Sequence, residues 1–109
     1  MVRQTSLDRL FHALAHEVRR DMLDRLTADD LTVGALAEPL AMSFVGASKH
    51  VKVLEQVGLI ERKVEGREHW CRLRAAELEP ASAWLQRYEL YWRDRLDALE
   101  DMIGRPGDR

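Results

Sequence analysis

Residues 43–60 read SFVGASKHVKVLEQVGLI, and this stretch decides how the rest of the chain is interpreted. Ser43 is a favoured N-cap and Gly58 a favoured C-terminal stop, so a helix is expected from Phe44 to about Gln56. Its inward face would consist of three apolar residues at helical spacing, Ala47, Val51 and Leu54. The opposite side would carry four polar or basic residues, Ser48, Lys49, His50 and Lys52.

A second, shorter helix is expected immediately before this one. Thr32 is a favourable N-cap for residues 33–37, and Pro39 should end that helix near Glu38. Two short helices joined by a turn of about three to four residues form a helix-turn-helix. The second helix of this motif enters the DNA major groove, with its N-terminal residues at the base edges. That leading end would hold three residues here, Ser43, Phe44 and Val45.

Two further helices are predicted before the helix-turn-helix. The first would have Thr5 or Ser6 as its N-cap, and the second would begin near Glu17, whose negative charge suits a first helical turn. Apolar residues of the first helix recur at helical spacing: Leu7, Leu10, Phe11 and Leu14. The second has a similar stripe: Val18, Met22 and Leu26. Each of these helices therefore has one apolar side.

A hairpin and a long helix are predicted after the helix-turn-helix. Residues 59–64 and 68–74 favour two strands, with residues 65–67 as the hairpin tip. Residues 81–103 favour one long helix. The order is helix, helix, helix-turn-helix, hairpin, long helix. The sequence therefore predicts a mainly α fold with a small β-hairpin.

The composition fits one small domain. The chain has 109 residues, of which 46% are hydrophobic and 33% charged, and single domains cluster at about 100–150 residues. We expect a single domain over residues 1–109, ordered over about 6–103, with a flexible tail at 104–109. No apolar run is long enough to cross a bilayer, and the N-terminus lacks the apolar core of a signal peptide. The lone Cys71 fits a reducing compartment, so we expect a cytoplasmic protein.

Charge is unevenly distributed along the chain. The formal net charge is −2, but residues 43–74 carry seven Lys or Arg against four Glu, and the segments on either side are acidic. A basic middle segment is typical of a small surface that faces phosphates, although a solvated mixed-charge surface would give the same count. Basic residues that could reach DNA lie on the predicted helix and hairpin: Lys49, Lys52, Arg62, Lys63 and Arg67. His50 could contact a base or a phosphate, or pack beneath the hairpin.

Three stretches resemble the ArsR/SmtB family of winged-helix transcriptional regulators. Residues 48–60 are similar to the recognition-helix signature of the family, residues 14–23 to the entry into its second helix, and residues 66–70 to its wing, which is the hairpin. With the long last helix, the resemblance covers about residues 6–103 in the right order. It implies a winged helix-turn-helix homodimer that binds double-stranded operator DNA through the fourth helix and the wing. Such proteins typically repress transcription, and an effector releases them.

The chain departs from many members of this family in its metal-binding residues. Relatives that sense metals use Cys residues in the third helix, or His and acidic residues in the last one, and neither predicted helix contains Cys or His here. Soft-metal and zinc sites need clustered ligands. We therefore expect no metal and no cofactor, and residues 91–100 resemble a non-metal-sensing branch instead. His16 stands where the family usually has Asp or Asn as a cap, which predicts a looser start of the second helix.

The long last helix has an apolar stripe that one small chain would not cover. Six residues spaced by three or four form it: Leu85, Tyr88, Trp92, Leu96, Leu99 and Ile103. Packing against the first helix of a second copy, through Leu7, Leu10 and Phe11, would bury this stripe, and aromatic anchors suit such interfaces. A core within one chain is the alternative. A twofold dimer would place two recognition helices roughly 34 Å apart, which predicts a near-palindromic operator.

Three classes of function compete for this sequence. The leading hypothesis is a sequence-specific DNA-binding transcriptional regulator, a repressor that binds a near-palindromic operator as a dimer. The alternative is a winged-helix protein–protein interaction module without operator-specific DNA binding. An enzyme is rejected, because the sequence has no Gly-rich phosphate loop, nucleophile elbow, paired-carboxylate site or metal motif. A small-molecule effector is compatible with the leading hypothesis, and the sequence does not identify one.

Overall fold

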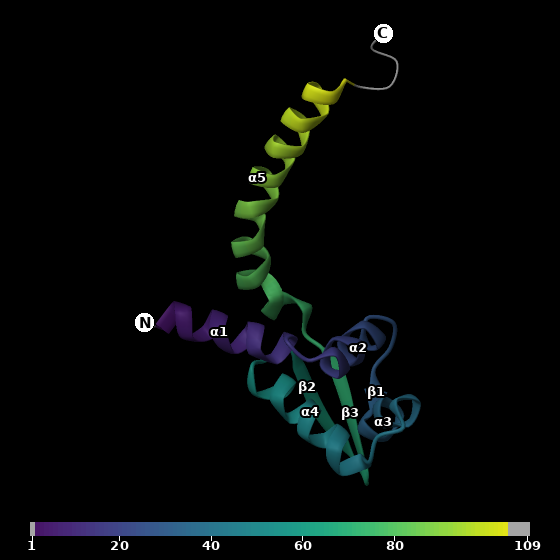
Figure 1. Cartoon of the computed structure of the whole chain (residues 1–109). Coiled ribbons are helices and arrows are strands. Elements are labelled where there is room, and N and C mark those ends of the chain that lie inside the picture. The colour runs from purple at the N-terminus through teal and green to yellow at the C-terminus, as the bar shows by residue number, and fades with distance from the viewer. Residues whose placement is uncertain (1, 105–109) are drawn as a thin grey trace. The chain divides into compact units, whose positions relative to one another are not determined.

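The structure, a computed structural model, describes residues 2–104, with side chains from Ser6 onward. Its helices and strands follow in the order α1 (Val2–Leu14), α2 (Glu17–Leu26), β1 (Leu31–Thr32), α3 (Val33–Ala37), α4 (Phe44–Gln56), β2 (Ile60–Glu65), β3 (Glu68–Leu73) and α5 (Glu79–Ile103) (Figure 1). Short 3-10 turns cover Glu38–Leu40 and Ala75–Leu78. The chain forms two compact units, one up to Glu79 and one from Pro80 onward, and each is described by itself. Apart from Gly104, the predicted flexible tail lies outside the described residues.

Side-chain caps start α3 and α4 where the sequence predicts them. The Thr32 hydroxyl accepts a hydrogen bond from the Ala35 backbone N–H at 3.1 Å. Ser43 Oγ accepts one from the Gly46 backbone N–H at 3.0 Å. Each bond satisfies one of the amide groups that have no partner at the start of a helix. The predicted bounds of both helices are confirmed.

α1 starts earlier than predicted, whereas α2 starts at Glu17 as predicted. α1 begins at Val2, ahead of both Thr5 and Ser6, so neither of these is its N-cap. The helix extends this far because residues 2–4 contain no Pro or Gly to stop it. His16 does cap α2, since its Nδ1 accepts a hydrogen bond from the Val18 backbone N–H at 3.2 Å. The imidazole thus takes the place of an Asp or Asn cap, and the predicted looser start of α2 is not observed.

Arginines of α2 donate hydrogen bonds to the carbonyl oxygens that end the neighbouring helices. At the end of α1, Arg19 donates from Nε to Ala13 at 2.6 Å and from Nη2 to His12 at 3.0 Å. At the end of α3, Arg25 donates to two carbonyl oxygens, at 2.7 and 2.9 Å. The last carbonyls of a helix lack partners within it and carry partial negative charge, so guanidinium groups are favourable there. α2 therefore anchors both α1 and α3.

The predicted hairpin belongs to a three-stranded antiparallel sheet with the strand order β1-β3-β2. β2 and β3 pair along their whole lengths, so Gly66 and Arg67 alone form the tip. Gly66 has φ +63°, a left-handed conformation that favours glycine in a tight hairpin turn. β1 pairs with β3 through Leu31 and Thr32. This strand is not predictable from alternation, because two residues are too few to show a period.

The core lies between the helices and one face of the sheet. Its buried side chains come from the four helices α1 to α4, from β2 and β3, and from the residue just before β2. They are Leu10, Ala13, Met22, Leu23, Leu26, Val33, Leu36, Ala37, Ala47, Val51, Leu54, Leu59, Ile60 and Cys71. The three predicted inward residues of α4 are all among them. Their burial fixes which side of α4 faces away from the core.

The connection between α3 and α4 spans residues 38–43, which is longer than predicted. Pro39 stands in the first turn of a 3-10 segment, where its missing N–H is tolerated, and Ala41 turns the chain with φ +50°. α3, this connection, α4 and the β2–β3 hairpin form a winged helix-turn-helix. The predicted fold class is confirmed, with β1 as an additional strand.

α5 forms the second unit almost entirely. It begins two residues ahead of the predicted start, because Pro80 is tolerated in a first helical turn. The six residues of the predicted apolar stripe are between 49% and 75% exposed in the single chain. Within residues 2–104, no helix is long and apolar enough to cross a membrane.

Candidate nucleic-acid interface

The free side of α4 lies opposite the core. Four exposed residues with spacings of four, three and four form one ridge along it, which we call the outward ridge: Val45, Lys49, Lys52 and Gln56. Three of them are predicted contact residues, and the structure brings these together. Gln56 was missed by the prediction, although continuing the same helical spacing by one turn would have found it. The ridge therefore combines two ammonium groups, one amide and one apolar side chain.

The leading end of α4 is apolar and faces solvent. Phe44 and Val45 are 57% and 65% exposed. The Ser43 hydroxyl accepts the capping hydrogen bond from Gly46 and keeps its O–H as a donor. Ser48 lies one turn after Phe44 and is half-buried. The predicted leading end thus lies at the surface, and its two large side chains, Phe44 and Val45, are apolar.

His50 lies on the flank of α4 that faces α2. Arg19 Nη1 is 3.3 Å from His50 Nδ1, and the His16 ring is 4.4 Å from the His50 ring. A guanidinium only donates hydrogen bonds, so His50 Nδ1 must accept and the ring proton must sit on Nε2. Burial, and then the charges of His16 and Arg19, lower the pKa of His50, which favours the same neutral ring. His50 therefore holds α4 against α2 and does not belong to the outward ridge.

Arg62 is predicted from the sequence to contact DNA, but in the structure it points toward α4. Its Nη2 is 3.4 Å from Glu55 Oε1 on α4, and its Nη1 is 3.3 Å from His69 Nδ1 on β3. Its Nε is buried and has no acceptor among the described residues. Side chains alternate along a strand, and Arg62 pairs with the buried Cys71, so both face the same side of the sheet. Arg62 thus ties the wing to the recognition helix.

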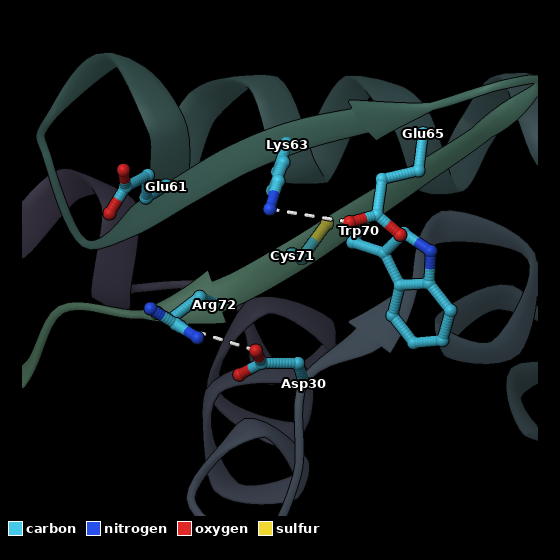
Figure 2. A pocket seen from close by; sticks show the side chains of 7 residues that line it. All are labelled: Asp30, Glu61, Lys63, Glu65, Trp70, Cys71 and Arg72. Carbon is cyan, nitrogen blue, oxygen red and sulfur yellow. Dashed lines mark hydrogen bonds and ion pairs between the residues drawn. The ribbon is translucent and has the colours of Figure 1, made fainter.

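The opposite face of the sheet has an open cavity of about 310 Å³ (Figure 2). Figure 2 shows two ion pairs there, Lys63 with Glu65 at 3.3 Å and Arg72 with Asp30 at 3.2 Å. Both pairs are exposed, and exposed ion pairs contribute only about 0–1 kcal/mol, so Lys63 can exchange its partner for a phosphate. Arg67 at the hairpin tip is also exposed. Of the wing residues predicted to contact DNA, Lys63 and Arg67 are therefore the two that can still do so.

The cysteine and histidine residues show no feature of a reactive or metal site. Cys71 is fully buried, and this burial raises the pKa of its thiol, against the opposing effect of Arg62. Its thiolate is therefore disfavoured. In the described part of the chain, no three His, Cys, Asp or Glu side chains lie together so that they could hold a metal ion.

The residues predicted to form a dimer interface differ in exposure. Leu10 of α1 is buried in the single chain, whereas Leu7 and Phe11 are half-buried. Leu10 is therefore a core residue, with its side chain already covered. The apolar stripe of α5 is exposed along its length. Of the two predicted parts of the interface, α5 thus has the larger apolar surface to bury.

Comparisons with known proteins agree with a DNA-binding role. The helix-turn-helix domain family matches residues 14–63. The chain is 32% identical to the HTH-type transcriptional regulator Rv2034 of Mycobacterium tuberculosis, over 105 residues and 94% of each protein. It is 28% identical to the transcriptional repressor SdpR of Bacillus subtilis, over 72% of this chain and 88% of that protein.

Solved structures share the fold. The crystal structure of the ArsR family transcriptional regulator RHA00566 matches with a TM-score of 0.75 and 32% identity, over 83% of this chain and 93% of that one. The solution structure of the homodimeric winged helix-turn-helix DNA-binding domain of Mb0332 from Mycobacterium bovis, a possible ArsR-family regulator, matches with a TM-score of 0.65 and 27% identity, over 79% of this chain and 80% of that one. The predicted family is confirmed, and the chain belongs to the ArsR family of winged helix-turn-helix transcriptional regulators.

Proposed function

We propose that this regulator binds a specific operator by inserting α4 into the major groove, with the outward ridge toward the DNA. The observation that carries the proposal is the difference between the sides of α4. One side is buried in the core, and the two flanks are held by Arg19 and Arg62, whereas the outward ridge is exposed and carries two lysines. A helix of about 10–12 Å diameter fits the major groove, where base edges can be distinguished.

The proposed contacts revise the set predicted from the sequence. From α4 and its N-cap they comprise Ser43, Phe44, Val45, Ser48, Lys49, Lys52 and Gln56, and from the wing Lys63 and Arg67. Arg62 is left out because its guanidinium contacts Glu55 and His69. His50 is a positioning residue, since its Nδ1 faces Arg19 and it can offer DNA no more than the Nε2 proton.

A second copy of the chain is the proposed protein partner. The exposed apolar stripe of α5 supports this, because soluble monomers rarely leave a continuous apolar surface of this kind uncovered. The homodimeric state of the Mb0332 domain supports it as well. A twofold dimer binds two half-sites about one helical turn apart, so we expect a near-palindromic operator.

Repression is the proposed mode of action, because the relative SdpR is a transcriptional repressor. Release by a small-molecule effector is compatible with this role. We assign no catalytic activity, metal or cofactor to the chain, and we expect it to act in the cytoplasm, where its DNA would be.

Selection of bound duplexes from a random library tests the proposal. Enrichment of a near-palindrome is expected, and the affinity for the selected duplex should fall steeply with salt. Each phosphate contact contributes about 0.9 to the slope of log affinity against log salt concentration, because counterions are released. No enrichment, together with weak binding that does not respond to salt, would mean that the chain is a protein–protein interaction module.

A further inference from the structure

The first turn of α4 is unusual for its exposed hydrocarbon. Among side chains described before α5, the large apolar residues that are more than half exposed are Phe44, Val45 and Val64. Single exposed apolar residues are common and need no explanation. Here, however, two of the three are consecutive, and they stand where a recognition helix meets the base edges.

This turn also lacks side chains that could read bases through hydrogen bonds. Residues 44–47 are Phe, Val, Gly and Ala. The nearest hydroxyl, on Ser43, already accepts a bond from Gly46. The buried Ala47 fixes the rotation of the helix, so that Val45 points away from the core and Phe44 lies toward the flank that carries Glu55. The side chains of residues 44–47 can therefore distinguish bases by apolar contact alone.

We infer that Phe44 and Val45 read thymine methyl groups in the operator. In the major groove the four bases present donors and acceptors, and the C5 methyl of thymine is the apolar group among them. An apolar side chain that covers this methyl buries apolar surface, which is favourable, and leaves no polar group unpaired. It would leave the exposed donor of cytosine or the acceptors of guanine without a partner, so these bases are disfavoured.

The inference divides the outward ridge into two parts with different roles. Val45 and its neighbour Phe44 would select thymine at the leading end. Lys49 and Lys52 lie one and two turns further along α4 and would supply charge to phosphates or guanine edges. The operator half-site is thus expected to contain thymine where the N-terminus of α4 meets it. This rests on the proposed function, which it deepens by naming the base that is read.

Replacement of thymine by deoxyuridine isolates the methyl group. Each thymine of the selected duplex is replaced singly, which removes one methyl and leaves base pairing unchanged. We expect a loss of about fourfold in affinity at each contacted thymine, the value for one methyl group that is no longer buried, and no loss elsewhere. Val45→Ser and Phe44→Ser should each bind the thymine and uracil duplexes with nearly equal affinity where the replaced side chain covered the methyl, and keep the preference elsewhere. Both positions are exposed, so the two variants should fold normally, which circular dichroism would verify.

Lys52→Ala is the matched control on the same ridge. It should weaken binding of both duplexes equally and keep the fourfold thymine preference. Equal binding of thymine and uracil duplexes by the unmodified protein, with the salt-dependent binding intact, would overturn the inference and leave the proposed function standing. A full thymine preference in both serine variants would also overturn it, because another group would then read the methyl. Absence of salt-dependent binding to every duplex would instead refute the proposed function.

Discussion

The Arg19→Ala substitution should lower the free energy of unfolding by about 3–5 kcal/mol. Arg19 is 8% exposed and donates to the carbonyl oxygens of Ala13 and His12 at 2.6 and 3.0 Å. Hydrogen bonds to a charged group contribute about 1.5–3 kcal/mol each, so the loss of the two Arg19 bonds gives the lower limit of the expected change in unfolding free energy. The Ala13 carbonyl that loses its donor and the lost contact with His50 account for the rest, whereas the His12 carbonyl still accepts from the Ala15 backbone N–H at 3.2 Å. A domain of this kind has about 5–15 kcal/mol of stability in total, so the effect would be large.

Urea unfolding followed by circular dichroism measures this loss, at one fixed protein concentration because the apparent stability of a dimer depends on concentration. Arg20→Ala is the matched control. It removes the same charge from the same helix, and Arg20 Nη1 also donates to the end of α1, to Leu14 at 2.8 Å, but it is exposed. The control should lose about 0.5 kcal/mol or less. If Arg19→Ala is no more destabilising than Arg20→Ala, the assignment of Arg19 as the anchor between α1, α2 and α4 is wrong.

Four further substitutions test the interface, the dimer and the histidine. Lys52→Ala should weaken binding to all DNA sequences and lower the salt slope by about one; an unchanged slope would remove Lys52 from the interface. Arg62→Ala should weaken operator binding by loosening the wing while the salt slope stays the same, and a lower slope would show that it contacts a phosphate. Trp92→Asp should give a monomer in sedimentation experiments, and a surviving dimer would contradict the proposed interface. The folded-state pKa of His50 is lowered, so its stabilising contribution is complete at neutral pH, declines below about pH 6.5 and is lost below the folded-state value. His50→Gln should lack this component of the pH dependence of unfolding, and identical pH profiles for both proteins would refute it.

The helices of the motif are predictable because local signals specify them. Ser43 and Thr32 have hydroxyl groups that cap the first turns of α4 and α3, and the structure shows both bonds. The apolar period of α4 also identifies its buried side correctly. These signals act over a few residues, so the sequence carries them directly. β1 carries no such signal, because its two residues are ordered by pairing with a distant strand.

The partners of charged side chains are less predictable, because they depend on how the elements pack. Arg19 and His50 are 31 residues apart, and no period relates them. Arg62 looks like a DNA contact when charge alone is considered. Its position in the strand does predict that it faces the core side of the sheet, since Arg62 is two residues after the buried Ile60. Strand alternation would therefore have corrected the prediction, whereas the contact with Glu55 required the structure.

The recognition helix is held on its two flanks by arginines that contact different acceptors. On one flank Arg19 donates to His50, and on the other Arg62 donates to His69 and also pairs with Glu55. Protonation of His50 would remove the acceptor and place a positive charge beside Arg19, so the contact with α2 would become repulsive. The ion pair between Arg62 and Glu55 does not involve His50. Protonation of His50 should therefore loosen α4 from α2, and His50→Gln tests this because it removes the titrating ring from that contact.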